Sequence, residues 1–200
     1  MTPDPSSTQD AAYTERLTAL QTVWWKRLLP VQAPYRWNVR KVHPGRVLDV
    51  GCGLGRNLQH LDGHGVGVDH NGDFVKTCRQ QGLTAYLPED FLASKDALPG
   101  GFDSILLAHV VEHLDVETVD EIFTTYLPFL RPGGLVHVVT PQERGFRFDP
   151  THVRFADFAE VTRVLREHGL TIEREWSFPF PRWAGEAFVY NEFNVTARRP

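Results

Sequence analysis

The sequence predicts an α/β fold in which helices cover both faces of a mostly parallel β-sheet. Short apolar runs alternate with amphipathic segments along most of the chain, which is the pattern of successive strand–helix units. The run at 102–108 is apolar almost throughout, as expected for a central strand of a parallel sheet. A glycine-rich turn follows the first run directly, and this indicates a strand-to-helix turn of the kind at which such sheets bind ligands.

Each element rests on a local pattern of apolar residues and chain breakers. Apolar residues at three- and four-residue spacing predict a helix over 11–29, and Pro30 ends it. Asn71 or Asp73 is placed to cap a helix that runs to about residue 81. The other helices are expected at 56–61, 115–130 and 157–168. Seven strands are expected at 46–50, 66–68, 84–87, 102–108, 135–139, 171–176 and 188–197.

Length and composition limit the class of protein. The 200 residues suit one domain, which we place at 11–200, with a helical cap over 11–40 and a flexible tail at 1–10. A content of 42% hydrophobic and 23% charged residues excludes a wholly disordered chain. The net charge of −4 argues against a nucleic-acid partner, because nonspecific binding to polyanions needs clustered positive charge.

The cysteines and the N-terminus predict where the protein works. Cys52 and Cys78 are the only cysteines, which is too few for a disulfide framework and favours a reducing compartment. Residues 1–10 have neither the basic nor the apolar region of a secretory signal. No apolar run approaches the roughly 18 residues that a membrane span needs. We therefore expect a cytoplasmic protein without a membrane span, and the sequence leaves a homodimer open.

The glycine-rich turn has the form D-x-G-x-G-x-G, beginning at Asp49. Glycine is needed where a ligand touches the backbone or where φ is positive, and the turn opens a helix whose free N–H groups face the ligand. Asp69 follows the second strand, where a carboxylate can accept hydrogen bonds from ribose hydroxyls. A dinucleotide site has G-x-G-x-x-G instead. Asp49 would repel a phosphate, whereas it suits a ligand that carries an ammonium group.

Five segments together resemble the successive motifs of class I S-adenosylmethionine-dependent methyltransferases. They are LDVGCGLGRN, GVDHN, the acidic pair Glu89-Asp90, FDSILLAHVVEHL and LRPGGLVHVVTP, and the resemblance covers about residues 45 to 176. It implies a Rossmann-like, seven-stranded, mostly parallel sheet whose last strand is antiparallel. It also implies S-adenosylmethionine as the cofactor.

The resemblance assigns cofactor contacts to individual positions of this sequence. It implies that Asp49, Gly51, Gly53 and Gly55 surround the methionine part, that Asp69 holds the ribose, and that Asp90 and Phe91 meet the adenine by edge and by stacking. His70 and His109 complete the expected set of cofactor-binding residues.

A cluster of histidines and a glutamate is expected beside the cofactor. The run His109-Val-Val-Glu-His113 begins at the carboxyl end of the fourth strand, and His152 lies in the loop after the fifth, which leaves from the same sheet edge. Three hypotheses stay open: a structural role, a histidine general base oriented by Glu112, or a divalent metal bound by His109, Glu112, His113 and His152. Magnesium prefers oxygen ligands, whereas three histidines would also suit manganese, zinc or iron.

The metal hypothesis is supported by a second resemblance. Metal-dependent ubiquinone-pathway O-methyltransferases and small-RNA 2′-O-methyltransferases carry E-x-x-E-H at this point, and the latter add a histidine after strand five. This chain has His109 where those families have the first glutamate. The pattern H-x-x-E-H also occurs in zinc peptidases, but there it lies within a helix, and here it follows a core strand.

The sequence therefore predicts a methyltransferase that acts on a hydroxyl group. We expect the acceptor to be a sugar or short oligosaccharide, as in the small enzymes that methylate mannosides. Its hydroxyl would be activated by Mg²⁺ or Mn²⁺ at the catalytic residues His109, Glu112, His113 and His152. The main alternative is a metal-independent O-methyltransferase of a quinone precursor or other small aromatic, with a histidine base. A cofactor-binding protein without turnover and a nicotinamide oxidoreductase are more remote alternatives.

Overall fold

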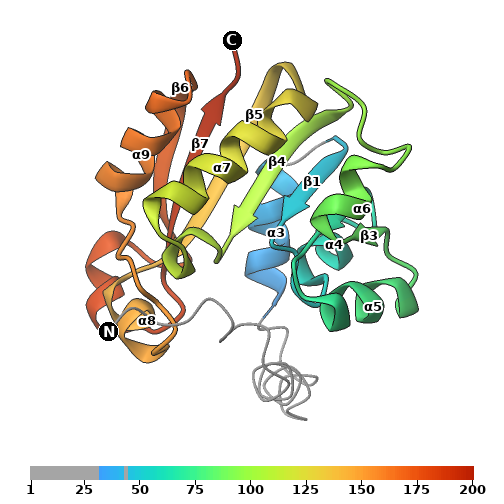
Figure 1. The fold of residues 1–200 in the computed structure, drawn as a ribbon. Coiled ribbons are helices and arrows are strands. Elements are labelled where there is room, and N and C mark those ends of the chain that lie inside the picture. The colour runs from blue at the N-terminus through green and yellow to red at the C-terminus, as the bar shows by residue number, and fades with distance from the viewer. Residues whose placement is uncertain (1–31, 43–44) are drawn as a thin grey trace.

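A seven-stranded sheet forms the centre of the structure (Figure 1). The computed structural model describes residues 32–42 and 45–200. The strand order is β3-β2-β1-β4-β5-β7-β6, and β7 runs antiparallel to both of its neighbours, while the other pairs are parallel. This confirms the predicted fold, including its antiparallel last strand. The strands are β1 (Val47–Val50), β2 (Gly65–Val68), β3 (Ala85–Tyr86), β4 (Phe102–Ala108), β5 (Leu130–Pro141), β6 (Thr171–Phe178) and β7 (Glu192–Arg198).

Helices pack on both faces of the sheet because the central strands are apolar on both sides. In β4, Ile105 and Leu107 join the large core cluster that includes residues of α7 and α9, whereas Leu106 packs with Val39 of α3 on the opposite face. The α-helices are α3 (Ala33–Val42), α4 (Arg56–His60), α5 (Gly72–Gln80), α6 (Pro88–Leu92), α7 (Val116–Tyr126), α8 (Glu143–Phe148) and α9 (Phe158–Glu167). The short 3₁₀ turns are η2 (Val111–His113), η3 (Leu127–Phe129) and η4 (Arg182–Glu186).

The starts of three helices follow from side-chain caps. Asn71 accepts hydrogen bonds from the backbone N–H groups of Asp73 and Phe74 at the start of α5, as the sequence predicts. Asp115 and Asp157 cap α7 and α9 in the same way.

Several predicted boundaries differ from the structure. The helix expected at 115–130 ends at Tyr126, and η3, which contains Pro128, replaces its last turn. Strand β5 is longer than the expected 135–139, and its pairing with β4 shifts register where the Pro-Gly-Gly segment lies. The helix expected at 11–29 and the tail at 1–10 lie outside the described residues.

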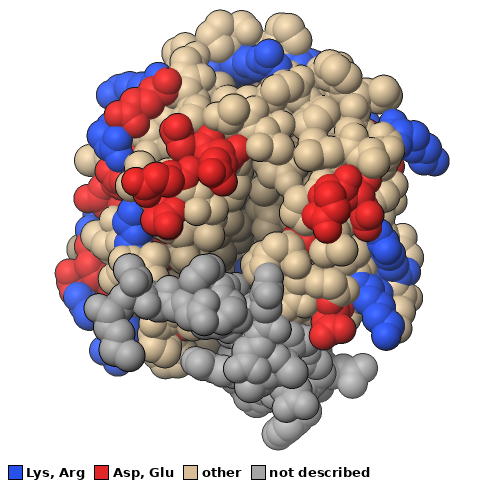
Figure 2. Space-filling view, in the orientation of Figure 1, with Lys and Arg blue, Asp and Glu red and all other residues tan. Residues whose placement is uncertain are grey.

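The charged side chains are unevenly placed on the face shown in Figure 2. Acidic side chains gather there over α7 and α6, which carry the exposed residues Glu117, Asp120 and Glu121, and Glu89 and Asp90. A hollow lies between these two acidic regions (Figure 2). No described helix combines the length and the apolar character needed to cross a lipid bilayer.

Candidate active site

The glycine-rich loop between β1 and α4 has a left-handed backbone at three positions. Gly51, Gly53 and Gly55 have φ values of +75°, +53° and +78°. A Cβ on Gly51 would lie 2.4 Å from a methyl of Val110, whereas a Cβ on Gly53 would meet nothing within 4 Å. Gly51 therefore allows close packing against the loop after β4, and Gly53 borders open space that a ligand can enter.

Asp49 lies near the end of β1, just before the glycine-rich loop, and its carboxylate is fully buried. By distance and angle neither of its oxygens accepts a hydrogen bond from a described residue, although the Asn57 side chain lies close enough to favour the ionised form. Burial raises the pKa of Asp49 to about 7, and the nearby charge of Asp69 adds to the shift, while Arg56 and Asn57 oppose it. An unpaired buried carboxylate is costly unless a cationic group joins it. Asp49 and the open space at Gly53 therefore fit a ligand with an ammonium group.

Asp69 connects the end of β2 to the glycine loop. One of its carboxylate oxygens accepts a hydrogen bond from the Gly53 N–H at 2.8 Å, and the other accepts one from the Asn71 N–H at 2.9 Å. His70 lies next to it, half-exposed, with its Nδ1 3.7 Å from an Asp69 oxygen. The expected ribose contact of Asp69 and the cofactor contact of His70 stay predictions, and both residues border the loop.

Asp90 and Phe91, which are expected to contact the adenine, lie in different environments in the structure. Asp90 is exposed on α6 and lies 4.0 Å from Arg79. Phe91 is fully buried, with its ring packed against Phe102 and Phe129 in the core. The expectation that Phe91 stacks on the adenine is wrong for this structure, because neither face of its ring is accessible. Short helix α6 turns Phe91 inward and leaves Asp90 at the surface.

His109 lies between two carboxylates at the end of β4. Its Nδ1 is 3.1 Å from Glu112 Oε1, and its Nε2 is 3.0 Å from Glu192 Oε1. Burial disfavours the charged ring, but these two carboxylates outweigh it and raise the pKa of His109 to about 10. Both ring nitrogens are thus protonated and occupied. This corrects the expectation that His109 is a metal ligand or a base, because it has no free lone pair.

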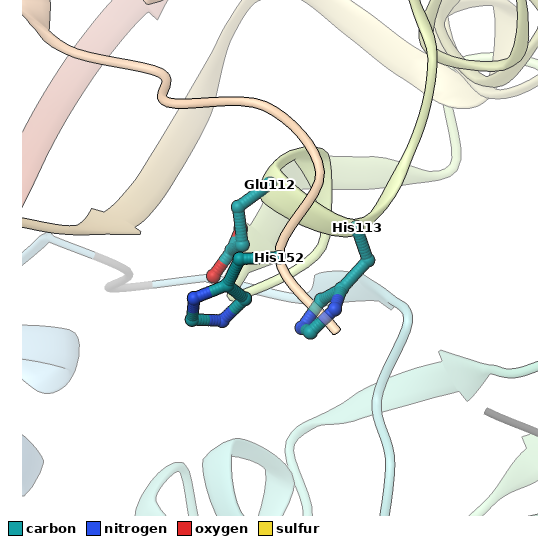
Figure 3. Close-up of side chains that lie close together, drawn as sticks. All are labelled: Glu112, His113 and His152. Atoms are coloured by element: carbon teal, nitrogen blue, oxygen red, sulfur yellow. The ribbon is translucent and has the colours of Figure 1, made fainter. Parts of the chain in front are cut away.

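Glu112, His113 and His152 converge on one space. Each offers one ligand atom, and these atoms all lie within 4.8 Å of one another. Figure 3 shows Glu112 and His113 on the turn after β4, and His152 on a separate loop, with the three side chains on the same side of that turn. Three of the four predicted metal ligands therefore come together, from two separate segments of the chain.

The hydrogen bonds of the two histidines favour metal binding. His152 Nδ1 is 2.9 Å from the Phe146 carbonyl oxygen, and His113 Nδ1 is 3.3 Å from that of Thr151. A carbonyl can only accept, and the Thr151 hydroxyl 3.2 Å from His113 Nδ1 donates to Asp149 instead. Each Nδ1 is therefore assigned the proton and each Nε2 keeps its lone pair, as in metal-binding histidines. The third candidate donor, Glu112 Oε2, is buried without a hydrogen-bond partner among the described residues.

The protonation states also suit a cation. Burial opposes ionisation of Glu112, but the His109 charge and hydrogen bond outweigh it and lower the pKa of Glu112. Burial lowers the pKa of His113, and Glu112 only partly opposes this. At neutral pH the group therefore presents a carboxylate and a neutral imidazole, the forms that bind divalent metals or accept a proton.

Sequence reasoning missed the polar residues that β7 brings to the site. Glu192 begins β7, and its backbone carbonyl accepts a hydrogen bond from the side chain of Gln142 at 3.1 Å. Asn191 donates to the Gln142 side-chain oxygen at 2.8 Å, and both residues are fully buried. No local motif marks these positions. The available signal was three neighbouring polar residues, Asn191, Glu192 and Asn194, in a segment otherwise typical of a buried strand.

A comparison with protein families decides the class of this site. A family model described as a methyltransferase domain matches residues 24–182, which is most of the chain. The chain belongs to this methyltransferase family. It is an S-adenosylmethionine-dependent methyltransferase, and the buried, unpaired Asp49 and the open space at Gly53 fit the ammonium end of that cofactor.

Several relatives share the name ubiquinone biosynthesis O-methyltransferase. The methyltransferase is 25% identical over 218 residues to a ubiquinone biosynthesis O-methyltransferase of Xanthomonas euvesicatoria, covering 90% of this chain and 89% of the relative. It is 30% identical over 162 residues to a protein of the same name from Chelativorans, covering 67% of this chain and 63% of the relative.

Solved structures agree on the fold of the methyltransferase. The N-methyltransferase NodS from Bradyrhizobium japonicum, in complex with S-adenosyl-L-homocysteine, is similar with a TM-score of 0.69 and 19% identity, covering 94% of this chain and 97% of that one. A SAM-dependent methyltransferase from Archaeoglobus fulgidus is similar with a TM-score of 0.63 and 21% identity, covering 84% and 93%.

Proposed function

We propose that this methyltransferase methylates a hydroxyl oxygen of a small aromatic acceptor with two adjacent oxygens, such as a catechol or a quinone precursor. The observation that carries the proposal is the convergence of Glu112, His113 and His152 beside the cofactor edge of the sheet. The names of the relatives, ubiquinone biosynthesis O-methyltransferases, favour this acceptor over a sugar.

The cofactor side of the proposal rests on the first two strands. S-adenosylmethionine supplies an activated methyl group on a positively charged sulfur. Asp49 would hold the ammonium end, Gly53 would let the backbone approach it, and Asp69 would accept hydrogen bonds from the ribose hydroxyls. These contacts orient the methyl group toward the acceptor edge, and orientation of this kind supplies several kcal/mol of the barrier, on the order of 7 or more in favourable cases.

The acceptor side needs a means of removing the hydroxyl proton. Two imidazoles and one carboxylate form a donor set that suits Mn²⁺ better than Mg²⁺, which prefers oxygen ligands. Such a cation would lower the pKa of an acceptor hydroxyl bound to it, so that the hydroxyl proton passes to solvent water before the methyl group is transferred. Three protein ligands leave room for two oxygens of the acceptor. We therefore propose that Glu112, His113 and His152 hold a divalent cation, with Mn²⁺ ahead of Mg²⁺.

Aromatic side chains border the proposed acceptor position. The ring of Phe146 stacks on the His152 imidazole, with centroids 5.5 Å apart, and Phe155 packs against Phe146 edge to face. Phe155 is also partly exposed. An accessible ring next to the proposed metal ligands supports a flat aromatic acceptor, because offset or edge-to-face ring contacts are favourable.

The test is methyl transfer from radiolabelled S-adenosylmethionine to a panel of acceptors. The panel holds catechols, monophenols and free mannosides, each assayed after chelation and again after addition of Mn²⁺ or Mg²⁺. We expect methylation of the catechols, lost on chelation and restored best by Mn²⁺. Methylation of mannosides alone would contradict the acceptor class. Full activity after chelation would contradict the cation and favour His113 as a general base.

A further inference from the structure

The backbone at His109 is strained in a way that places its ring. His109 has φ +61°, one of two positive values among the described residues other than glycine, and such a conformation costs on the order of 1 kcal/mol or more. Its N–H donates to the Val139 carbonyl oxygen at 2.9 Å, so the chain is still paired with β5 where it turns. The turn directs the imidazole between Glu112 and Glu192 instead of toward His113 and His152.

Glu112 is held at one oxygen and free at the other. Its Oε1 pairs with the His109 ring, whereas its buried Oε2 has no partner among the described residues. A carboxylate that is fixed at one oxygen has little freedom to rotate, so the direction of the second oxygen is fixed too. That second oxygen is the one available to a ligand shared with His113 and His152.

Glu192 is held in place by contacts between β7 and the end of β5. It begins β7 opposite Pro141 of β5, and only 8% of it is exposed. Its carbonyl accepts from Gln142, whose side chain is held in turn by Asn191. The His109 ring therefore lies between the carboxylate of Glu112 and that of Glu192, which is 83 residues from His109 in the chain.

We infer that Glu192 and His109 are positioning residues, which together aim the free oxygen of Glu112 at the ligand shared with His113 and His152. The inference deepens the proposed function and rests on the cation site in it. The Glu192 carboxylate contacts the His109 ring and not the group formed by Glu112, His113 and His152, so it acts through His109. Loss of the Glu192 carboxylate frees one ring nitrogen of His109 and lets the ring and Glu112 reorient.

The experiment measures Mn²⁺ and S-adenosylhomocysteine dissociation constants by calorimetry in the full-length protein. We expect Glu192→Ala to weaken Mn²⁺ binding about 10- to 100-fold, the range for residues that orient metal ligands, with S-adenosylhomocysteine binding unchanged. Glu192→Gln keeps an oxygen for the His109 N–H and should recover part of this loss. Adding His109→Ala to Glu192→Ala should weaken Mn²⁺ binding little further, because Glu192 acts through His109. Glu186→Ala, which removes an exposed carboxylate paired with Arg147, is the matched control.

The outcomes separate this inference from the proposed function. Equal Mn²⁺ affinity in the parent and in Glu192→Ala would overturn the inference alone. A parent protein that binds no Mn²⁺ would overturn both the inference and the proposed cation. If Glu192→Ala fails to fold, Glu192→Gln decides: a Mn²⁺ affinity equal to that of the parent, with S-adenosylhomocysteine affinity intact, would also contradict the inference, and a weaker one would support it.

Discussion

The sheet edge carries two proposed sites, a cofactor half and an acceptor half, which are built in different ways. The cofactor half lies on β1, β2 and the loop between β1 and α4, and its link from Gly53 to Asp69 spans 16 residues. The acceptor half joins the turn after β4, the loop after β5 and the start of β7, and its link from His109 to Glu192 spans 83 residues. The first half is therefore specified by a local motif, and the second by the way the whole sheet assembles.

The two halves also differ in how their buried carboxylates, Asp49 and Glu112, are paired. The carboxylate of Asp49 has no described partner, so a cationic ligand would complete it. The carboxylate of Glu112 is half satisfied, because His109 takes one oxygen and leaves the other. The cofactor half therefore contains a buried carboxylate that a cationic ligand would pair, whereas the acceptor half contains a carboxylate that His109 already holds in place.

The largest expected effect tests the acceptor half. His113→Ala and His152→Ala should each lower kcat/KM for a catechol by about 100-fold or more, the usual loss when a positioned acid–base or ligand group is removed. S-adenosylhomocysteine binding should stay within twofold of the parent, since these residues are not in the cofactor half. His64→Ala, at an exposed histidine before β2, is the control and should leave both quantities unchanged. Loss of cofactor binding in either variant would break the proposed separation of the halves.

Asp49→Asn tests the cofactor half by removing charge and keeping shape. It should weaken S-adenosylhomocysteine binding by up to about 100-fold, because a charged hydrogen bond is worth roughly 1.5–3 kcal/mol. Mn²⁺ binding should be unaffected. Calorimetry with each ligand in turn gives both numbers, and unchanged cofactor affinity would show that Asp49 does not hold the ammonium group.

The raised pKa of Asp49 should also make the free energy of unfolding depend on pH. The folded-state pKa of Asp49 is about 7 and its unfolded value is near 3.8, so between these pH values the folded protein binds more protons than the unfolded chain. This group therefore lowers the free energy of unfolding as pH rises from about 4 to 7. Asp49→Asn should melt at a higher temperature than the parent at pH 8, and the difference should shrink toward pH 5. A constant difference across that range would contradict the raised pKa.

Two glycines of the same loop should respond differently to alanine. Gly51→Ala should lower the free energy of unfolding by about 2 kcal/mol or more, because left-handed backbone strain adds to the overlap with Val110. Gly53→Ala should cost only the strain, about 1 kcal/mol, but should weaken cofactor binding, since its new methyl enters the open space. Urea unfolding and calorimetry measure the two effects. Equal stability loss in both variants would contradict the assigned difference in packing.

The smallest expected effect lies in the scaffold of the acceptor half. Asp157 caps α9 by accepting from the Glu160 N–H at 3.0 Å, so Asp157→Ala should lower the free energy of unfolding by about 1 kcal/mol. Activity per folded molecule should not change. A large loss of activity would mean that α9 contributes to the site as well as to the scaffold.

The sequence predicts the fold well because its signals are local. Strand β4 agrees with its predicted limits, and Asn71 caps α5 as expected, since both depend on residues close in the chain. The glycine loop and Asp69 lie together for the same reason. Phe91 is the exception, because a residue next to an exposed acidic side chain can face either the ligand or the core, and here packing against other aromatic rings decides.

The acceptor half is predicted only in part because its geometry is tertiary. Spacing alone brings His113 close to Glu112, and the shared sheet edge brings in His152. Spacing cannot reveal the left-handed turn at His109, nor the carboxylate of Glu192 that occupies its second nitrogen. His109, which the motif predicts to be a metal ligand, therefore pairs with two carboxylates in the structure instead.

Anomalous diffraction at the manganese edge, from crystals grown with S-adenosylhomocysteine and Mn²⁺, tests the central claim most directly. We predict one strong peak bounded by Glu112 Oε2 and the Nε2 atoms of His113 and His152, with His109 still between Glu112 and Glu192. A map with no peak at these atoms, or with the ion ligated by His109, would contradict it.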